Sequence, residues 1–179
     1  GLSYFIGSIP FGLLLAKAMG LGNLRKIGSG NIGATNVLRT GNKKAAALTL
    51  ALDAAKGALA VALALSYSGE ASAQIAAIST VLGHCYPVWM RFQGGKGVAT
   101  LLGVYYALSW PLGFAACATW LAAAALFRFS SLAALMTTAS APIWALLLGY
   151  PTMLVLCLAL AILVFWRHRS NIMRLSKGQ

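Results

Sequence analysis

Long apolar runs separated by short polar segments cover the sequence from one end to the other. A helix needs about 20 apolar residues to cross a bilayer, with a range near 17–25. Most of the seven runs reach that range, whereas two neighbouring runs are shorter and are separated by Pro111. The pattern therefore predicts an all-α, polytopic integral membrane protein. The runs are approximately 2–19, 45–68, 73–90, 98–110, 112–127, 130–148 and 150–166.

The distribution of Lys and Arg determines how many runs cross and in which direction. If all seven cross, the basic loops all fall on one side, and the opposite loops near 69–72, 110–112 and 149–151 contain no Lys or Arg. This partition follows the positive-inside rule. Merging the two short runs around Pro111 would place Arg128 and the basic tail on the wrong side. We therefore predict seven transmembrane helices, with the N-terminus outside and the C-terminus in the cytoplasm, in a single domain over residues 1–179.

Composition supports a membrane protein and limits its partners. Apolar residues make up 60% of the chain and charged residues only 9%, whereas a soluble domain carries about 25% charged residues. The net charge of +12 suits anionic lipid or an anionic substrate. Nucleic acid is not expected, because the basic residues lie in short loops between apolar runs. The chain begins at Gly1 without a methionine, so we expect a few N-terminal residues to be missing.

The first polar segment, residues 28–39, is rich in glycine and small polar residues, and no acidic residue precedes it. Glycines allow backbone N–H groups to approach an anion, and successive N–H groups form anion-binding nests. A short helix opened by Thr35 or Asn36 would add a favourable dipole, and Arg39 could bind a phosphate with two hydrogen bonds. A flexible linker is the alternative. The candidate phosphate-binding residues are Gly28, Ser29, Gly30, Asn31, Thr35, Asn36 and Arg39.

The second polar segment, residues 92–100, places Lys96 on a glycine turn before an apolar run. The spacing does not match a Walker loop, because Gly97 follows the lysine where Ser or Thr is required. A lysine at the start of a helix nevertheless suits phosphate binding. The alternative is that Lys96 only marks the cytoplasmic side. The candidate residues are Gly94, Gly95, Lys96, Gly97 and Thr100.

The third polar segment is the C-terminal tail. His168 and Asn171 are three residues apart, so both can lie on one face of a helix at the membrane boundary. The tail could equally be a basic stop that binds anionic lipid headgroups. Within the second run, Asp53 and Lys56 are also three residues apart, and we expect a structural ion pair there. His84 either supports the site or is a satisfied core histidine.

Several motifs follow one another along nearly the whole chain: Gly28-Ser-Gly-Asn31, Ala34-Thr-Asn36 with Arg39, Asp53-x-x-Lys-Gly57, Gly83-His with Pro87, Phe92-x-Gly-Gly-Lys-Gly-Val-Ala-Thr100 and His168-Arg-x-Asn-Ile172. Together they resemble the bacterial acyl-phosphate:glycerol-3-phosphate acyltransferases, the PlsY family.

The resemblance implies a seven-helix enzyme of the bacterial inner membrane that moves a fatty acyl group from acyl phosphate to the 1-hydroxyl of sn-glycerol 3-phosphate. The products would be lysophosphatidic acid and phosphate, in phospholipid synthesis. It also implies a hand-off from an enzyme that forms acyl phosphate. One position departs from the family, because Ala134 stands where the family often has serine, and Ser131 is a candidate substitute.

The residues assigned to catalysis by the resemblance are Ser29, Lys96, His168 and Asn171, and Arg169 joins those that bind phosphate. Acyl phosphate is already activated, so positioning and charge neutralisation are the main requirements, and no acyl-enzyme is expected. We hypothesise that the departing phosphate oxygen accepts the hydroxyl proton. Two histidines and one inside carboxylate do not readily complete a metal site, so neither a metal nor a cofactor is expected.

Two other classes of protein remain as alternatives. A transporter of phosphorylated anions would explain the basic site, but it predicts an inverted repeat and polar groups at mid-membrane depth. The sequence has no visible repeat, and its polar groups cluster at one boundary. A non-catalytic lipid-binding or assembly protein gives no reason for Ser29, Asn31 and Asn171 beside the cations.

Overall fold

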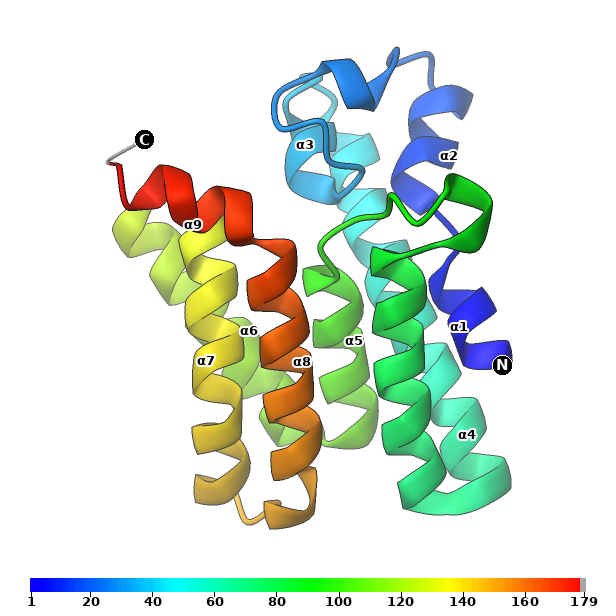
Figure 1. Cartoon of the computed structure of the whole chain (residues 1–179), viewed down its shortest axis with the longest axis vertical. Helices are drawn as coiled ribbons and strands as arrows, with labels where there is room; N and C mark the ends of the chain where they lie inside the picture. The colour runs from blue at the N-terminus through cyan, green and yellow to red at the C-terminus, as the bar shows by residue number, and fades with distance from the viewer. Residues whose placement is uncertain (178–179) are drawn as a thin grey trace.

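The computed structural model describes residues 1–177, and within them it contains α-helices and short 3-10 helices but no β-strand. The prediction of an all-α protein is confirmed. The α-helices, shown in Figure 1, are α1 (Leu2–Gly7), α2 (Phe11–Ala18), α3 (Ala34–Leu38), α4 (Lys43–Cys85), α5 (Val98–Leu108), α6 (Trp110–Phe127), α7 (Ser130–Leu147), α8 (Leu154–Arg167) and α9 (Arg169–Leu175). The 3-10 helices are η1 (Leu24–Lys26), η2 (Val88–Met90) and η3 (Pro151–Met153).

Helix α4 contains two of the predicted runs, joined at a sharp break. Gly69 lies there with φ of 78°, a conformation that only glycine adopts readily. The chain turns back at this point, at the bottom of Figure 1, so α4 consists of two antiparallel limbs. The runs 45–68 and 73–90 are therefore two neighbouring helical segments.

Not every predicted run forms a helix long enough to span a bilayer. Among the described residues, three helical segments meet the length and hydropathy of a membrane span: Lys43–Met90, α6 and α7. Pro151–Arg167 and Arg169–Leu175 meet them only as a pair bent by 67°. Helix α5 has 11 residues, and the first run is divided into α1 and α2. The count of seven spans and the orientation of the termini remain predictions.

The first run breaks between Gly7 and Phe11, where Pro10 precedes α2. Its first half, α1, packs directly on the backbone of α4. A methyl group on Gly7 would lie 2.0 Å from the carbonyl oxygen of Thr80, and one on Gly83 would lie 2.1 Å from that of Tyr4. Glycines therefore allow the two backbones to touch, and α1 is fixed on α4 although it is only six residues long.

Small and aliphatic side chains from α4, α5, α6, α7 and α8 form most of the buried core, which includes Val81, Leu101 and Leu160. Large apolar side chains such as Leu126, Val155 and Ile162 point outward, as expected of surfaces that face lipid. The polar segments gather at the end of the bundle that is uppermost in Figure 1, where α3, α9 and the chain before α5 lie. The candidate site is at this end.

Candidate active site

A cavity of about 670 Å³ lies at the polar end of the bundle, and all three polar segments contribute to its wall. One part of the wall is polar and carries four cationic side chains. The other part is apolar and is formed largely by α6 and α5. The cations are Arg39, Lys96, Arg128 and Arg174, and the apolar side chains include Leu50, Leu102, Cys117, Trp120, Leu121 and Phe129.

The first loop, residues 28–36, is held together by the amide of one of its own residues. Asn36 is almost fully buried, and its Nδ2 donates to the carbonyl oxygens of Leu24 (3.0 Å) and Asn31 (2.7 Å). Its Oδ1 accepts from the backbone N–H of Ser29 at 3.1 Å. The sequence pattern assigned Asn36 to phosphate binding, but these bonds occupy its donors. We interpret Asn36 as the residue that fixes the loop.

Two further contacts determine where the first loop presents its polar groups. Helix α3 begins at Ala34, so Thr35 and Asn36 lie in its first turn and do not open it. Thr35 Oγ1 lies 3.1 Å from Ser130 Oγ at the start of α7, which joins the loop to the opposite wall. Arg39 follows α3, and its guanidinium lies against Gly28, where an added methyl group would be 2.5 Å from Nη1.

The second loop, residues 94–97, is held by residues from other elements. The N–H groups of Gly94 and Gly95 donate to the carbonyl oxygens of Cys85 (3.1 Å) and His84 (3.0 Å). Arg167, at the end of α8, donates through Nη2 to Gly94 O and through Nε to Gly95 O, each at 3.0 Å. Because the N–H groups of both glycines are already bonded, we expect phosphate to meet Lys96 and the start of α5 instead.

Lys96 lies at the polar end of the cavity among several positive charges. Its Nζ donates to Oδ1 of Asn171, which orients the ammonium group. Burial, together with Arg174, Arg167 and Arg39, lowers the pKa of Lys96 to about 8. A bound anion would offset this repulsion, so the geometry favours an anionic ligand beside Lys96.

His168 lies at the bend of 67° between the segment that contains α8 and helix α9. It is buried, and its Nδ1 lies 2.8 Å from the carbonyl oxygen of Val164. Since a carbonyl only accepts, Nδ1 carries the proton and Nε2 is left as an acceptor. Burial lowers the pKa of His168 to about 4, and Lys96 and Arg167 act in the same direction. The imidazole is therefore neutral near pH 7.

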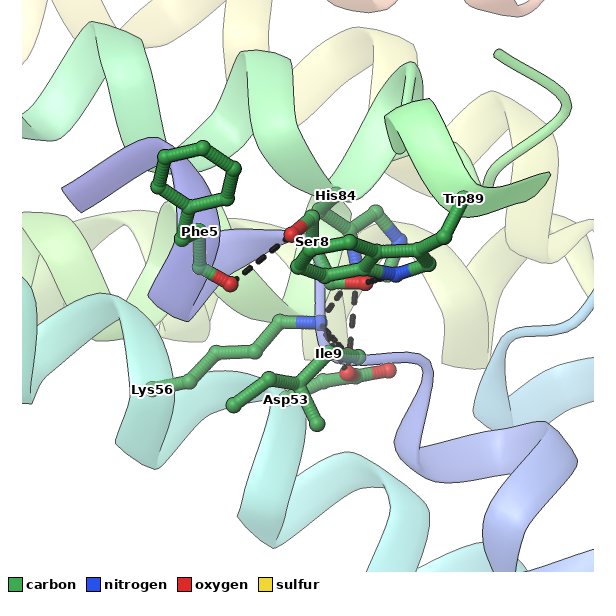
Figure 2. A network of polar contacts seen from close by, with 7 residues as sticks. All are labelled: Phe5, Ser8, Ile9, Asp53, Lys56, His84 and Trp89. Carbon is green, nitrogen blue, oxygen red and sulfur yellow. Dashed lines mark hydrogen bonds and ion pairs between the residues drawn. The ribbon is translucent and has the colours of Figure 1, made fainter. Parts of the chain in front are cut away.

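Asp53 and Lys56 form the predicted ion pair, with 2.7 Å between Oδ1 and Nζ, and both side chains are buried. Figure 2 shows that His84 belongs to the same network, since its Nδ1 lies 3.0 Å from Lys56 Nζ. Asp53 and His84 also reach the cavity wall.

The structure brings most of the sequence-predicted site residues to one cavity. Those that line it are Gly28, Ser29, Asn31, Thr35, Asn36, Arg39, Lys96, Gly97, Ser131, His168 and Asn171. Arg169 is directed away, with its guanidinium 5.0 Å from the ring centre of Trp166. Thr100 is fully buried on α5, and Gly30, Gly94 and Gly95 act as turn and contact positions outside the lining.

Sequence reasoning missed several residues that matter to the site. Arg25 donates to Gly30 O in the first loop (3.4 Å) and to Gln93 O beside the second, so it joins the two loops. Burial, with Arg167, lowers the pKa of Arg25. In the sequence, Arg167, Arg128 and Arg174 stand out only as charges that set the topology. Ser130 and Trp120 carry no sequence signal, because apolar runs place aromatic and small polar residues on every face.

Comparisons with known proteins identify the family of the chain. A family model described as "Glycerol-3-phosphate acyltransferase" matches residues 1–178. A glycerol-3-phosphate acyltransferase from Jannaschia sp. (strain CCS1) is 60% identical over 178 residues, which cover 99% of this chain and 88% of that protein. One from Dinoroseobacter shibae is 61% identical over 176 residues, covering 98% and 87%.

Two crystal structures of PlsY (YgiH), an integral membrane glycerol 3-phosphate acyltransferase, share the fold. The glycerol 3-phosphate form superposes with a TM-score of 0.93 at 40% identity, and covers 99% of this chain and 90% of that one. The lysophosphatidic acid form has a TM-score of 0.90 at 38% identity, and covers 98% and 89%. The resemblance seen in the motifs is thus confirmed, and the chain belongs to the glycerol-3-phosphate acyltransferase family of integral membrane enzymes.

Proposed function

We propose that the protein transfers a fatty acyl group from acyl phosphate to the 1-hydroxyl of sn-glycerol 3-phosphate. The observation that carries this proposal is the cavity, which combines Arg39, Lys96 and Arg174 with an apolar wall on α6. The cations suit the phosphate groups of both substrates, and the apolar wall suits a fatty acyl chain. PlsY (YgiH) has glycerol 3-phosphate and lysophosphatidic acid forms, and we infer that both molecules bind in this cavity.

The reaction requires positioning and charge neutralisation more than a strong base. The 1-hydroxyl oxygen attacks the acyl carbonyl carbon, an ester bond forms, and the bond from that carbon to the phosphate oxygen breaks. Lys96, oriented by Asn171, and Arg39 offset the repulsion between the two phosphates. Ser29 lines the same wall, where its hydroxyl is within reach of a bound substrate. No bond forms between the acyl group and a side chain.

The proton of the attacking hydroxyl goes to the departing phosphate oxygen. His168 is a weak base because its pKa is about 4, so in this proposal it helps to position the glycerol and does not remove the proton of the 1-hydroxyl. A His168→Gln variant tests this assignment. If an ionisation with a histidine pKa vanishes from the pH profile of this variant together with most of the rate, histidine is the base and the assignment fails.

The site lies at the cytoplasmic face of the bacterial inner membrane in this proposal. The support is the distribution of charge, since the loops at the opposite end, near 69–72, 110–112 and 149–151, contain no Lys or Arg. Seven crossings with the N-terminus outside follow from the same rule. Acyl phosphate would then reach the cavity from an enzyme that forms it on the cytoplasmic side.

Acyl transfer by the purified protein tests the donor directly. Labelled glycerol 3-phosphate is offered with acyl phosphate or with acyl-CoA in parallel, and lysophosphatidic acid is measured. Product from acyl phosphate alone, lost in a Lys96→Ala variant, is the expected result. Product from acyl-CoA alone would overturn the donor assignment. Binding of glycerol 3-phosphate without product from either donor would favour a transporter.

A further inference from the structure

A buried polar network lies directly beneath the second loop. Its members are Asp53 and Lys56 on the first limb of α4 and His84 on the second, with exposed fractions of 2%, 3% and 5%. Figure 2 shows the three side chains directed toward one another, beside the carbonyl of Ile9 at the break between α1 and α2. The network therefore connects three segments that are distant in sequence.

The ammonium group of Lys56 contacts three groups within this network. It forms the ion pair with Asp53 Oδ1 (2.7 Å), donates to the carbonyl oxygen of Ile9 (2.7 Å) and lies 3.0 Å from His84 Nδ1. An ammonium group has three donors and no acceptor, so Nδ1 of His84 must accept. The ring proton of a neutral imidazole then lies on Nε2. Neither nitrogen of His84 is free to remove a proton from a substrate.

The far side of the His84 ring lies against Gly95. A methyl group added to Gly95 would be 2.1 Å from Nε2, 2.9 Å from Cε1 and 3.0 Å from Cδ2, so its three nearest atoms all belong to this ring. The backbone of Gly95 does not have a positive φ, so contact with the ring, and not backbone strain, excludes a side chain there. The N–H of Gly95 also donates to the carbonyl oxygen of His84 at 3.0 Å.

We propose that His84, fixed by Asp53 and Lys56, is a positioning residue that determines the place of Lys96 relative to the bound phosphate. The ring and the carbonyl of His84 both contact Gly95, and Lys96 is the next residue in the chain. A displaced ring would therefore move the ammonium group that binds the anion. The inference rests on the proposed role of Lys96 in phosphate binding.

The test enlarges Gly95 by one methyl group and combines this change with a smaller side chain in place of His84. Gly95→Ala places a methyl group against the ring and is expected to lower kcat/KM about 100-fold by displacing Lys96. His84→Asn keeps an acceptor for Lys56 near the position of Nδ1 but removes the part of the ring over Gly95. The kcat/KM of the double variant should therefore exceed that of Gly95→Ala at least about tenfold. If the two changes acted independently, the double variant would instead be less active than Gly95→Ala.

Gly94→Ala is the matched control, because its clash cannot be relieved by changing His84. An added methyl group there would lie 2.1 Å from the backbone oxygen of His84, 2.5 Å from Pro87 Cδ and 2.7 Å from the oxygen of Cys85. His84→Asn should not rescue Gly94→Ala. Rescue of both glycine variants would indicate general loosening of the fold and would overturn the proposal.

Binding and melting measurements separate this inference from the proposed function. Binding of labelled glycerol 3-phosphate is measured without a donor, and the melting temperature in detergent reports folding. His84→Asn alone should raise the KM for glycerol 3-phosphate more than it lowers kcat, with a melting temperature near that of the wild type. Unchanged KM in that variant, or a double variant no better than Gly95→Ala, would overturn the positioning role. Failure of the wild type to use acyl phosphate would overturn only the donor assignment.

Discussion

The two glycine-rich loops beside the cavity are held in place in different ways. In the first loop, the amide of Asn36 bonds to Leu24, Ser29 and Asn31, all within 12 residues of it in sequence. The second loop is held by the carbonyl groups of His84 and Cys85, which lie about ten residues before it, and also by Arg167, which is more than 70 residues away. The place of Lys96 thus depends on the packing of α8 as well as on local contacts.

This difference predicts which remote changes reach the active site. A change near the end of α8 or in the buried network of α4 should displace Lys96 and leave Arg39 in place. A change within residues 28–36 should do the reverse. The two cations are therefore expected to respond to different sets of substitutions, although they line one cavity.

Removal of the second loop's charge should have the largest effect. Lys96→Ala is expected to lower kcat/KM about 1,000-fold, because a preorganised, partly buried cation is lost where two phosphates meet. Steady-state assays over a range of glycerol 3-phosphate concentrations measure the loss. Lys26→Ala, an exposed cation outside the cavity, is the control and should behave like the wild type. Equal losses in both variants would mean that only net charge matters.

Loss of the contacts between Arg167 and the second loop should have the second largest effect on kcat/KM. Arg167→Ala deletes both hydrogen bonds to the second loop and the stacking on Tyr86, where the guanidinium carbon lies 4.9 Å from the ring centre. We expect kcat/KM to fall about 100-fold through misplacement of Lys96. Arg167→Lys keeps the charge but not the planar guanidinium group, whose Nε and Nη2 donate to two carbonyl oxygens, so it should recover only part of the loss. Full recovery would show that charge, and not geometry, is what Arg167 supplies.

The same contrast explains which parts of the site could be predicted from the sequence. Residues 28–39 form a local unit, so their density of Gly, Ser and Asn is enough to indicate an anion site. Asn36 was nevertheless assigned to phosphate, because a sequence does not show that its amide is occupied by the loop. The roles of Arg25 and Arg167 depend on contacts far apart in sequence, and a basic residue at the end of a helix equally marks membrane topology.

The sequence also predicted the helices of the fold well, but it did not reveal a break in the first of them. Apolar runs identified the helices well, because hydropathy follows directly from the solvent that a helix faces. The first run was expected to be continuous, but it is broken at Pro10, where Lys56 bonds to the carbonyl of Ile9. Hydropathy carries no signal for such a break, because both halves are equally apolar.

Loss of the local support should have a smaller effect on catalysis and a measurable one on stability. Asn36→Ala removes the hydrogen bonds that fix the first loop and leaves the partly buried carbonyl oxygen of Asn31 without its amide donor. We expect about a tenfold loss of kcat/KM and a loss of about 1–3 kcal/mol in the free energy of unfolding. Denaturation in detergent measures the second quantity. Asn23→Ala, which removes one exposed cap, should change both much less.

The pKa of Lys96 predicts how activity depends on pH. The pKa is lowered to about 8, so the ammonium form is present below that pH and is lost as pH rises through it. The second pKa of a phosphate monoester is about 6, so substrate charge is constant over this range. We expect kcat/KM to fall about fivefold between pH 8 and pH 9, as the protonated fraction of Lys96 falls from about one half to about one tenth. Lys96→Arg keeps its charge, so its profile should be flat there, and a similar fall in that variant would exclude Lys96 as the cause.

The smallest expected effect concerns the side-chain contact between the first loop and α7. Thr35 Oγ1 and Ser130 Oγ lie 3.1 Å apart in an exposed position, so this hydrogen bond competes with water. Thr35→Val or Ser130→Ala should lower kcat/KM only about threefold, and the double variant should be no worse than either single one. Multiplication of the two losses would mean that each hydroxyl binds substrate separately. A loss near that of Arg167→Ala would show that the first loop also depends on remote support, because α7 would then position Arg39 as α8 positions Lys96.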